Sequence, residues 1–409
     1  MRGVSTPSTC ACWVTSDARR RRAPVMRWLL LALLSLCASA AFGAPKVGVV
    51  TMQPGEIFWE RFGHNALVVL DPETGRATSY NFGFFDPGEP DFIGRFVRGD
   101  MRYRLVALPF QQDMAVYREE GRGVSLQWLD LEPAAAQALA DALAENARPE
   151  NAHYRYDYFL DNCSTRVRDA IDEAIGGALR RQIAGRSQGA TYRSEAVRLA
   201  SPAPLMWLGF DLGLGPSADR PLSRWAEAFV PMRLADSLRE VKLADGRPLV
   251  QDEYQILPHR LAPEPFGSRR HWGWWALAGV VIGAGLLWLG ARKPRLLAAL
   301  AMSGWTLAGV LAALMLFIWL GTAHRFGWAN HNLLLFNPLC WLLLPGGWQL
   351  LRGRQPRAWF RWLLLVVAAC PVVALFTYWL SALPQRHLHW IVLLLPVHAA
   401  LAWAWGRKP

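Results

Sequence analysis

The spacing of apolar residues divides the chain into two unlike parts. Up to about residue 258, apolar residues come in short runs separated by glycine, proline and aspartate, whereas beyond residue 271 they come in long runs. A helix needs roughly 20 apolar residues to cross a bilayer. Five stretches of the second part approach this length: 272–291, 296–321, 333–351, 362–383 and 388–405. The pattern therefore predicts an all-α membrane domain of five transmembrane helices at 272–409.

The short runs of the first part predict an α+β domain at 44–258. Runs rich in β-branched and aromatic residues, bounded by turn-forming residues, are typical of strands. We expect strands at 47–52, 66–70, 78–82, 103–108 and 124–129. Apolar residues spaced three and four apart predict helices at 133–146 and 164–175, and Gly176 follows the second as a C-cap. A proline-rich linker, 259–271, leads to the first span.

The N-terminus has the pattern of an export signal. Met26 and Arg27 precede a short apolar run, which is followed by small residues around Ala38 to Ala40. A basic start, a short apolar stretch and small residues define a secretory signal peptide. We assign 1–43 to an N-terminal extension and signal peptide with the true start at Met26, and an uncleaved anchor is the alternative. Residues 44–258 are then exported.

The distribution of charge changes what the composition implies. The formal net charge of +12 taken alone would suggest nucleic-acid binding. The exported part is in fact slightly acidic, and 271–409 contains 11 basic and no acidic residues. Nine of the 11 lie in gaps that alternating topology places in the cytoplasm, and only Arg325 and Arg386 lie outside. This positive-inside bias places the C-terminus in the cytoplasm. Because the basic residues lie between membrane spans and not in the exported domain, nucleic acid is not expected as a partner.

Cys163 is the one cysteine of the exported domain, and unpaired thiols are unusual in an oxidising compartment. A buried structural cysteine is the simpler interpretation, but the neighbours of Cys163 favour chemistry. With Asp161 or Asn162 as N-cap, Cys163 enters the first turn of a helix, where backbone N–H groups stabilise a thiolate. Arg166 adds positive charge nearby. We predict Cys163 to be a nucleophile and count Asn162 and Arg166 among the site residues.

A thiolate nucleophile needs a base, and His64 is the preferred partner. It stands at the entry of a predicted strand, directly after Gly63, whereas the other two histidines lie in a polar stretch and in the linker. Asn81 or Tyr80, on the next strand, is expected to orient the second ring nitrogen. No metal-binding pattern such as H-E-x-x-H occurs in this domain, so neither a metal nor another cofactor is expected.

A basic stripe on a predicted strand and the stretch before it has two interpretations. Arg102 and Tyr103 belong to it, together with Arg95, Arg98, Arg104 and Phe96. A solvated strand edge is the simpler interpretation, and contact with phospholipid head groups is the functional one. Polar residues at the outer face of the membrane domain raise the same question: His324, Asn330 and Asn332 are either head-group contacts or ordinary interfacial residues.

Several motifs together resemble the Lnb-type periplasmic domain, a family associated with bacterial lipoprotein N-acylation. They are Gly63-His64-Asn65, Tyr80-Asn81-Phe82-Gly83, the segment from Tyr156 to Cys163, Thr191-Tyr192-Arg193 and the glycine-rich 209–215 with 218–221. The segment from Asn330 to Leu339 is similar to the membrane domain often fused to that family. The order of His before Asn-Cys also resembles circularly permuted papain-like enzymes, such as the lecithin:retinol acyltransferase group.

The resemblance implies a papain-like, circularly permuted α+β domain in the periplasm and a multi-pass protein of the bacterial inner membrane. It implies Cys163 as nucleophile and His64 as general base. The expected function is a thiol acyltransferase with a phospholipid as acyl donor and bacterial lipoproteins as acceptors. Two alternatives stay open: a periplasmic cysteine peptidase or amidase, and a non-enzymatic membrane assembly or sensor protein.

Overall fold

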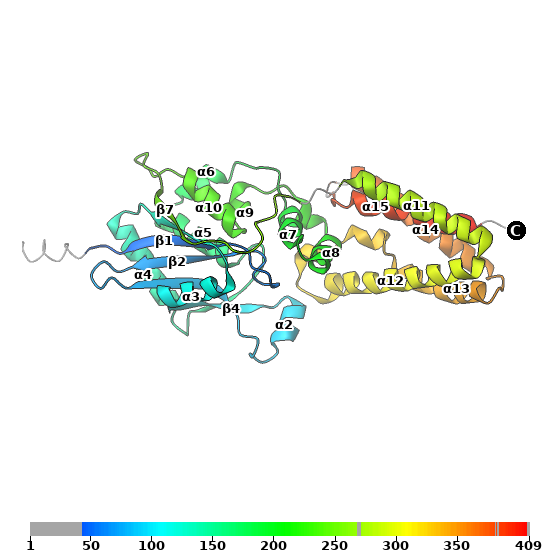
Figure 1. Ribbon diagram of the computed structural model, residues 1–409, viewed down its shortest axis with the longest axis horizontal. Coiled ribbons are helices and arrows are strands. Elements are labelled where there is room, and N and C mark those ends of the chain that lie inside the picture. The colour runs from blue at the N-terminus through cyan, green and yellow to red at the C-terminus, as the bar shows by residue number, and fades with distance from the viewer. Residues whose placement is uncertain (1–42, 268–270, 381, 383, 407–409) are drawn as a thin grey trace, which may run out of the picture.

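The computed structural model describes residues 43–267, 271–380, 382 and 384–406. The extension and signal predicted at 1–43 therefore lie almost wholly outside the described residues. A domain built on a β-sheet occupies one end of the molecule, and a bundle of long helices occupies the other (Figure 1). The short helices α7 and α8 lie where the two parts meet (Figure 1). This arrangement agrees with the division that the apolar pattern predicts.

The sheet has seven strands, and all neighbouring strands are antiparallel. Their order across the sheet is β6-β4-β3-β2-β1-β5-β7. The five predicted strands are confirmed with small changes at their ends. The two strands that the sequence did not predict lie at the sheet edges, and both are largely exposed, so they carry little apolar signal. The strands are β1 (Lys46–Met52), β2 (His64–Leu70), β3 (Ala77–Phe84), β4 (Arg102–Pro109), β5 (Val124–Leu129), β6 (His153–Arg155) and β7 (Val250–Leu257).

Helices cover both faces of this sheet. On one face, Val49 and Leu67 pack with apolar residues of α4, α5, α6 and α10. On the other, Val50 and Val68 pack with Met114 of α3. The predicted helices at 133–146 and 164–175 are confirmed as α4 and α5. The helices of this part are α2 (Phe92–Arg98), α3 (Phe110–Glu120), α4 (Pro133–Asn146), α5 (Cys163–Ala174), α6 (Ala178–Ile183), α7 (Tyr192–Ala200), α8 (Pro204–Gly213), η1 (Pro216–Asp219), α9 (Arg224–Glu227) and α10 (Pro231–Glu240).

Four helices are long and apolar enough to cross a membrane within the described residues, and a fifth crossing exists if one bent segment counts as a span. The long helices are α11 (Trp272–Arg292), α12 (Pro294–Gly321), α14 (Ala358–Leu380) and α15 (Leu388–Gly406). The bent segment consists of η2 (Arg325–Gly327), η3 (His331–Leu334), η4 (Pro338–Leu343) and α13 (Leu344–Leu351).

The span predicted at 333–351 is wrong as a continuous helix. Pro338 has no N–H for a helical hydrogen bond, and the Asn337 side chain instead accepts from the Leu339 N–H at 2.9 Å. The chain therefore breaks between η3 and η4, where the two halves meet at 42°. The broken backbone lies against α12 and α14, whose side chains bury Cys340 and Leu343. Irregular backbone at membrane depth is tolerated where protein surrounds it.

Candidate active site

Cys163 is the first residue of α5, and a capping box holds it there. The Asn162 side chain accepts from the Thr165 N–H at 2.9 Å, and the Thr165 hydroxyl accepts from the Asn162 N–H at 2.8 Å. Asn162 also donates to the carbonyls of Phe229 and Tyr158. The N-cap prediction is confirmed for Asn162. Because its side chain is fully used by these bonds, Asn162 positions Cys163 and is not itself a reacting group.

His64, the first residue of β2, lies beside Cys163, and the two side chains interact electrostatically. Its Nε2 lies 3.0 Å from Oδ1 of Asn81 on β3, which leaves Nδ1 for the thiol. Of the two orienting residues predicted, Asn81 makes this contact, and Tyr80 points its ring into the core beside Leu67. Three separate elements thus bring Cys163, His64 and Asn81 together. The arrangement is that of a nucleophile, a base and an orienting group.

A bulge in β3 lets the start of α5 approach the sheet closely. The pairing of β3 with β4 shifts register between Asn81 and Phe84. Gly83, within the bulge, has a φ of 92°, which residues with a side chain rarely adopt. A Cβ at this position would lie 3.6 Å from the Cβ of Cys163. The glycine therefore supplies the backbone conformation, and a side chain there would be strained by its φ rather than by a clash with Cys163.

The groups around Cys163 and His64 together outweigh the effect of burial on the pKa of both side chains. Burial raises the pKa of the Cys163 thiol, but His64 and the backbone N–H groups of Asn65 and Ser164 bring that pKa below its ordinary value. Burial lowers the pKa of His64, but Cys163, Asn81 and Asp113 together bring it above its ordinary value. Shifts in these directions favour a thiolate beside an imidazolium, the reactive form of such a pair.

Asp113, on α3, contacts Asn81 on the side away from His64. The sequence did not predict this role for it. Its carboxylate is buried and accepts from Nδ2 of Asn81 at 3.0 Å and from the Ser79 hydroxyl. These bonds fix the Asn81 amide so that its oxygen faces His64. The sequence offered no signal for this contact. The apolar pattern of α3 is too weak to predict the helix, and Asp113 lies 32 residues from Asn81 in sequence.

Replacing Asp113 with asparagine tests its role as a positioning residue. Loss of the carboxylate removes a charge that raises the pKa of His64, so the imidazolium weakens and the Cys163 pKa rises. We expect alkylation of Cys163 by iodoacetamide at pH 7 to slow by about tenfold, one pKa unit, and its pH profile to shift upward. The exposed Asp141→Asn change on α4 is the matched control. An Asp113→Asn profile that overlays the wild type would refute the role.

A second buried amide clamps α5 to the sheet. Asn65 is fully buried, and its Nδ2 donates to the Thr51 hydroxyl at 2.8 Å. Its Oδ1 lies 2.9 Å from the Ser164 hydroxyl, next to Cys163. The Asn65 backbone also helps to lower the pKa of the Cys163 thiol. Asn65 was part of the Gly-His-Asn motif, but its position beside a candidate histidine did not reveal this role.

Arg166 does not face the thiol as an isolated positive charge. Its guanidinium forms two hydrogen bonds with Asp161, at 2.6 and 2.8 Å, and stacks over the Tyr154 ring at 3.7 Å. This pairing largely neutralises the charge that the sequence placed near Cys163. Arg166 therefore braces the segment that precedes α5, through Asp161 and Tyr154.

The membrane domain touches the segment that carries Cys163. Arg325 of η2 pairs with Asp157 at 2.8 Å, and the Asp157 side chain accepts from the N–H groups of Phe159 and Leu160. His324 stacks on Tyr158, with ring centroids 5.9 Å apart. Residues just before and within η2 thus contact the turn between β6 and α5. The candidate site is built beside the surface at which the two domains meet.

Two protein-family models match the chain. The Lnb N-terminal periplasmic domain matches residues 39–195, and the Lnb transmembrane domain matches residues 274–404. The matched ranges together cover most of the chain and contain Cys163, His64 and Asn81. The chain belongs to the Lnb-type family. No significant match is found among curated proteins or among solved structures.

The Lnb-type membrane domain uses its outer polar residues mainly to hold the two domains together. Asn330 and Asn332 are buried, and each donates to the Leu212 carbonyl, at 2.6 and 3.0 Å. Gln385 donates to Asn330 at 2.9 Å. Both asparagine side chains are therefore buried within the protein, which keeps them away from lipid head groups. His324 keeps one ring face on Tyr158 and bonds the Phe96 carbonyl at 3.0 Å.

Most of the basic stripe of this Lnb-type domain is also paired. Arg95 bonds Glu89 at 2.6 Å, Arg98 bonds Asp91, and Arg104 lies over the Phe84 ring at 5.0 Å. Arg102 is exposed on β4, and its neighbour Tyr103 is buried with its ring 4.4 Å from that of Tyr156. Tyr103 therefore belongs to the wall beside the candidate site, and the stripe offers little unpaired charge for head groups.

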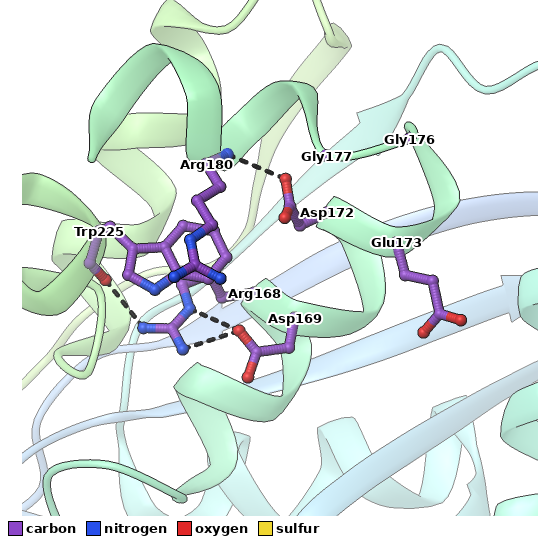
Figure 2. A pocket seen from close by; sticks show the side chains of 8 residues that line it. All are labelled: Arg168, Asp169, Asp172, Glu173, Gly176, Gly177, Arg180 and Trp225. Atoms are coloured by element: carbon purple, nitrogen blue, oxygen red, sulfur yellow. Dashed lines mark hydrogen bonds and ion pairs between the residues drawn. The ribbon is translucent and has the colours of Figure 1, made fainter. Parts of the chain in front are cut away.

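A pocket on α5 lies toward the helix end remote from Cys163 (Figure 2). Figure 2 shows Arg168 bonded to Asp169, and Asp172 accepting the Arg180 N–H. A second cavity lies between α4 and α5. Neither is lined by Cys163 or His64. Within the described residues, no cluster of three or more metal-ligating side chains is present.

Proposed function

We propose that this Lnb-type chain is a membrane-tethered cysteine acyltransferase of the bacterial inner membrane. It moves an acyl chain from a phospholipid, through a thioester on Cys163, to the N-terminal amine of a lipoprotein, without a cofactor. One observation carries the proposal: the Cys163–His64–Asn81 group adjoins the turn before α5, which the membrane domain contacts directly. A nucleophile at this place meets substrates that reside in the bilayer.

The first half of the reaction forms the acyl-enzyme. The Cys163 thiolate attacks the ester carbonyl carbon, and the negative charge moves to the carbonyl oxygen. N–H groups at the start of α5 and the positive end of its dipole stabilise that oxyanion. The C–O bond then breaks, and the lysophospholipid leaves with a proton from the His64 imidazolium. A thioester on Cys163 and a neutral imidazole remain.

The second half transfers the acyl chain. The neutral α-amine of the lipoprotein attacks the thioester carbonyl, the C–N bond forms, and His64 accepts the amine proton. The C–S bond breaks and restores the thiolate beside the imidazolium. Asn81, held by Asp113, keeps Nδ1 of His64 directed at the sulfur through both halves. Dividing the transfer into two steps lets the lysophospholipid leave before the lipoprotein amine reacts.

The order of the site elements supports a circularly permuted papain-like architecture. The histidine strand, β2, precedes the cysteine helix, α5, and the orienting amide lies on the neighbouring strand β3. Helix-borne cysteine beside strand-borne histidine is the arrangement of papain-like enzymes, whose unpermuted members have the cysteine first. The distribution of basic residues in the tail supports a cytoplasmic C-terminus.

A cysteine peptidase or amidase would use the same groups with water as acceptor. The buried contacts between the sheet domain and the membrane domain favour the transferase. A hydrolase of soluble substrates has no need for a site built against a membrane domain. The placement of His64 beside Cys163, which lowers the pKa of the thiol, weighs against a purely structural or sensory role, which requires no such pairing.

The proposed function is tested in cells that lack lipoprotein N-acylation. We expect expression of the wild-type chain to add an acyl chain to the N-terminal amine of a reporter lipoprotein, measured by mass spectrometry of its N-terminal peptide. A matched strain with an empty vector gives the baseline. A reporter that keeps a free amine in both strains would refute the transferase. Release of free fatty acid without amine acylation would favour the hydrolase.

A further inference from the structure

Helix α2 exposes an apolar surface that the proposed chemistry does not explain. None of its residues is buried, and the Ile93 side chain is 74% exposed. Phe96 and Val97 on the same short helix are also exposed. Single exposed apolar residues are common in soluble domains, but a group of large ones marks an interaction surface.

A second exposed apolar segment joins α2 through aromatic contacts. It consists of Ile57, Phe58 and Trp59 in the loop that follows β1. The Trp59 ring meets Phe85 edge-on at 5.9 Å, and Phe85 stacks on Phe92, the first residue of α2, at 5.6 Å. The two segments therefore form one continuous surface. We define the α2 patch as Ile57, Phe58, Trp59, Ile93, Phe96 and Val97.

The α2 patch lies at the level where a membrane span ends. The Ala323 N–H donates to the Arg98 carbonyl at 2.8 Å, and His324 bonds the Phe96 carbonyl at 3.0 Å. These two residues directly follow α12, near whose end Leu320 remains highly exposed. Figure 1 shows α2 at the junction between the sheet domain and α12. The helix is thus fixed to the bilayer-facing side of the domain.

Charge in the α2 patch favours acyl chains over head groups as its contact. Arg95 and Arg98 are the basic residues of α2, and each is paired with an acidic residue outside the helix. Paired charges attract anionic head groups weakly and cost less to bring near an apolar phase than unpaired ones. The exposed side chains of the α2 patch are aromatic and aliphatic. Segments that lie in the membrane interface have this composition.

An aromatic row leads from the α2 patch to the thiol. The Phe85 ring lies 5.1 Å from that of Tyr103, and Tyr103 lies 4.4 Å from Tyr156. A Cβ on Gly83 would lie 3.7 Å from Tyr156 and 3.6 Å from Cys163, so Tyr156 is next to the nucleophile. The row is apolar along its length except for the tyrosine hydroxyls.

We propose that the α2 patch inserts among the acyl chains of membrane phospholipids and that the aromatic row guides an acyl ester to Cys163. The second clause rests on the proposed function, whereas insertion of the patch does not. Apolar contact along this row would lower the cost of drawing an acyl chain out of the bilayer, since each CH₂ group that leaves the lipid would remain in apolar surroundings.

Insertion is tested by photocrosslinking of the full chain in nanodiscs of phosphatidylethanolamine and phosphatidylglycerol. A benzophenone amino acid replaces Ile93, and the matched control replaces Tyr254, which is exposed on the edge strand β7. We expect phospholipid adducts on position 93 at least tenfold more abundant than on position 254, measured by mass spectrometry. Equal adduct levels at the two positions would overturn the proposal, whether or not the protein transfers acyl chains.

The guiding role is tested with Ile93→Asp and Trp59→Asp together. We expect the acyl adduct on Cys163 to form from nanodisc phospholipid at least tenfold more slowly, while iodoacetamide alkylates Cys163 at the wild-type rate. Tyr254→Asp should leave both rates unchanged. Wild-type rates of adduct formation in the double variant would overturn the guiding role. A wild-type chain that forms no acyl adduct would refute the proposed function, and the crosslinks would still decide insertion.

Discussion

Replacing Cys163 with alanine is expected to lower acyl transfer by a factor on the order of 10⁴ or more. The substitution removes the atom that attacks the ester, and no neighbouring group replaces it, because His64 acts as a base toward the sulfur and Asn81 orients His64. Intact-mass spectrometry of the chain incubated with phospholipid gives the most direct measurement. The wild type should gain the mass of one acyl chain, which hydroxylamine removes, and Cys163→Ala should gain none.

Cys370→Ala provides a matched control for that experiment. Among the described residues the free cysteines are Cys163, Cys340 and Cys370, and only the last two lie in the membrane domain. Cys370 is partly exposed like Cys163 but far from His64, so its loss should leave the acyl adduct unchanged. If Cys163→Ala kept the adduct and Cys370→Ala lost it, the nucleophile assignment would be wrong.

Replacing Asp219 with alanine should cause the largest loss of stability. Its carboxylate pairs with Arg193 at 2.8 Å, and the two side chains are 0% and 1% exposed. Arg193 also donates to the carbonyls of Asp211 and Leu214, each at 2.6 Å. Removing one partner of a buried pair leaves the other charge uncompensated, at a cost of about 3 to 5 kcal/mol. We expect the apparent melting temperature to fall by roughly 10 °C.

The Asp219 prediction is measured by circular dichroism of the full chain in detergent, against Glu145→Ala as control. Glu145 pairs with Arg148 on the surface, where both side chains are more than half exposed. Such surface pairs contribute little, so the control should melt within about 1 °C of the wild type. If Asp219→Ala melted at the same temperature as the control, the prediction that the buried Arg193–Asp219 pair stabilises the fold would be wrong.

The Asp219 pair also explains motifs that the sequence alone left without a role. Arg193 belongs to Thr191-Tyr192-Arg193, and Asp219 belongs to the 218–221 segment. The pair joins α7 to η1, and the Arg386 N–H donates to Asp219 from the loop before α15 at 2.9 Å. Nearby, Asp211 accepts from Trp390 at 2.8 Å. Residues that resembled family markers therefore act in the contact between the sheet domain and the membrane helices.

The sequence by itself determined those elements of the structure that depend on neighbouring residues in the chain. Long apolar runs predicted the membrane domain, since burial of apolar surface in lipid needs no distant partner. The alternation of short runs predicted the central strands, and Asn162-Cys163 before an amphipathic stretch predicted the start of α5. The candidate nucleophile and its candidate histidine were predicted from residue type and local setting, and the structure places them side by side. The third span was predicted as a continuous helix, and its break was missed because hydropathy counts apolar residues but not the backbone hydrogen bonds that Pro338 removes.

Only the tertiary structure decided which residues surround the thiol. Asp113 reaches Asn81 across 32 positions of sequence, and Arg325 reaches Asp157 across 168. Both contacts depend on how α3 packs on the sheet and how the membrane domain docks beside α5. The choice of Asn81 over Tyr80 likewise follows from strand alternation, which turns consecutive side chains to opposite faces. Local pattern placed the reacting groups on their elements, and long-range packing selected their partners, because those partners meet only after the chain has folded.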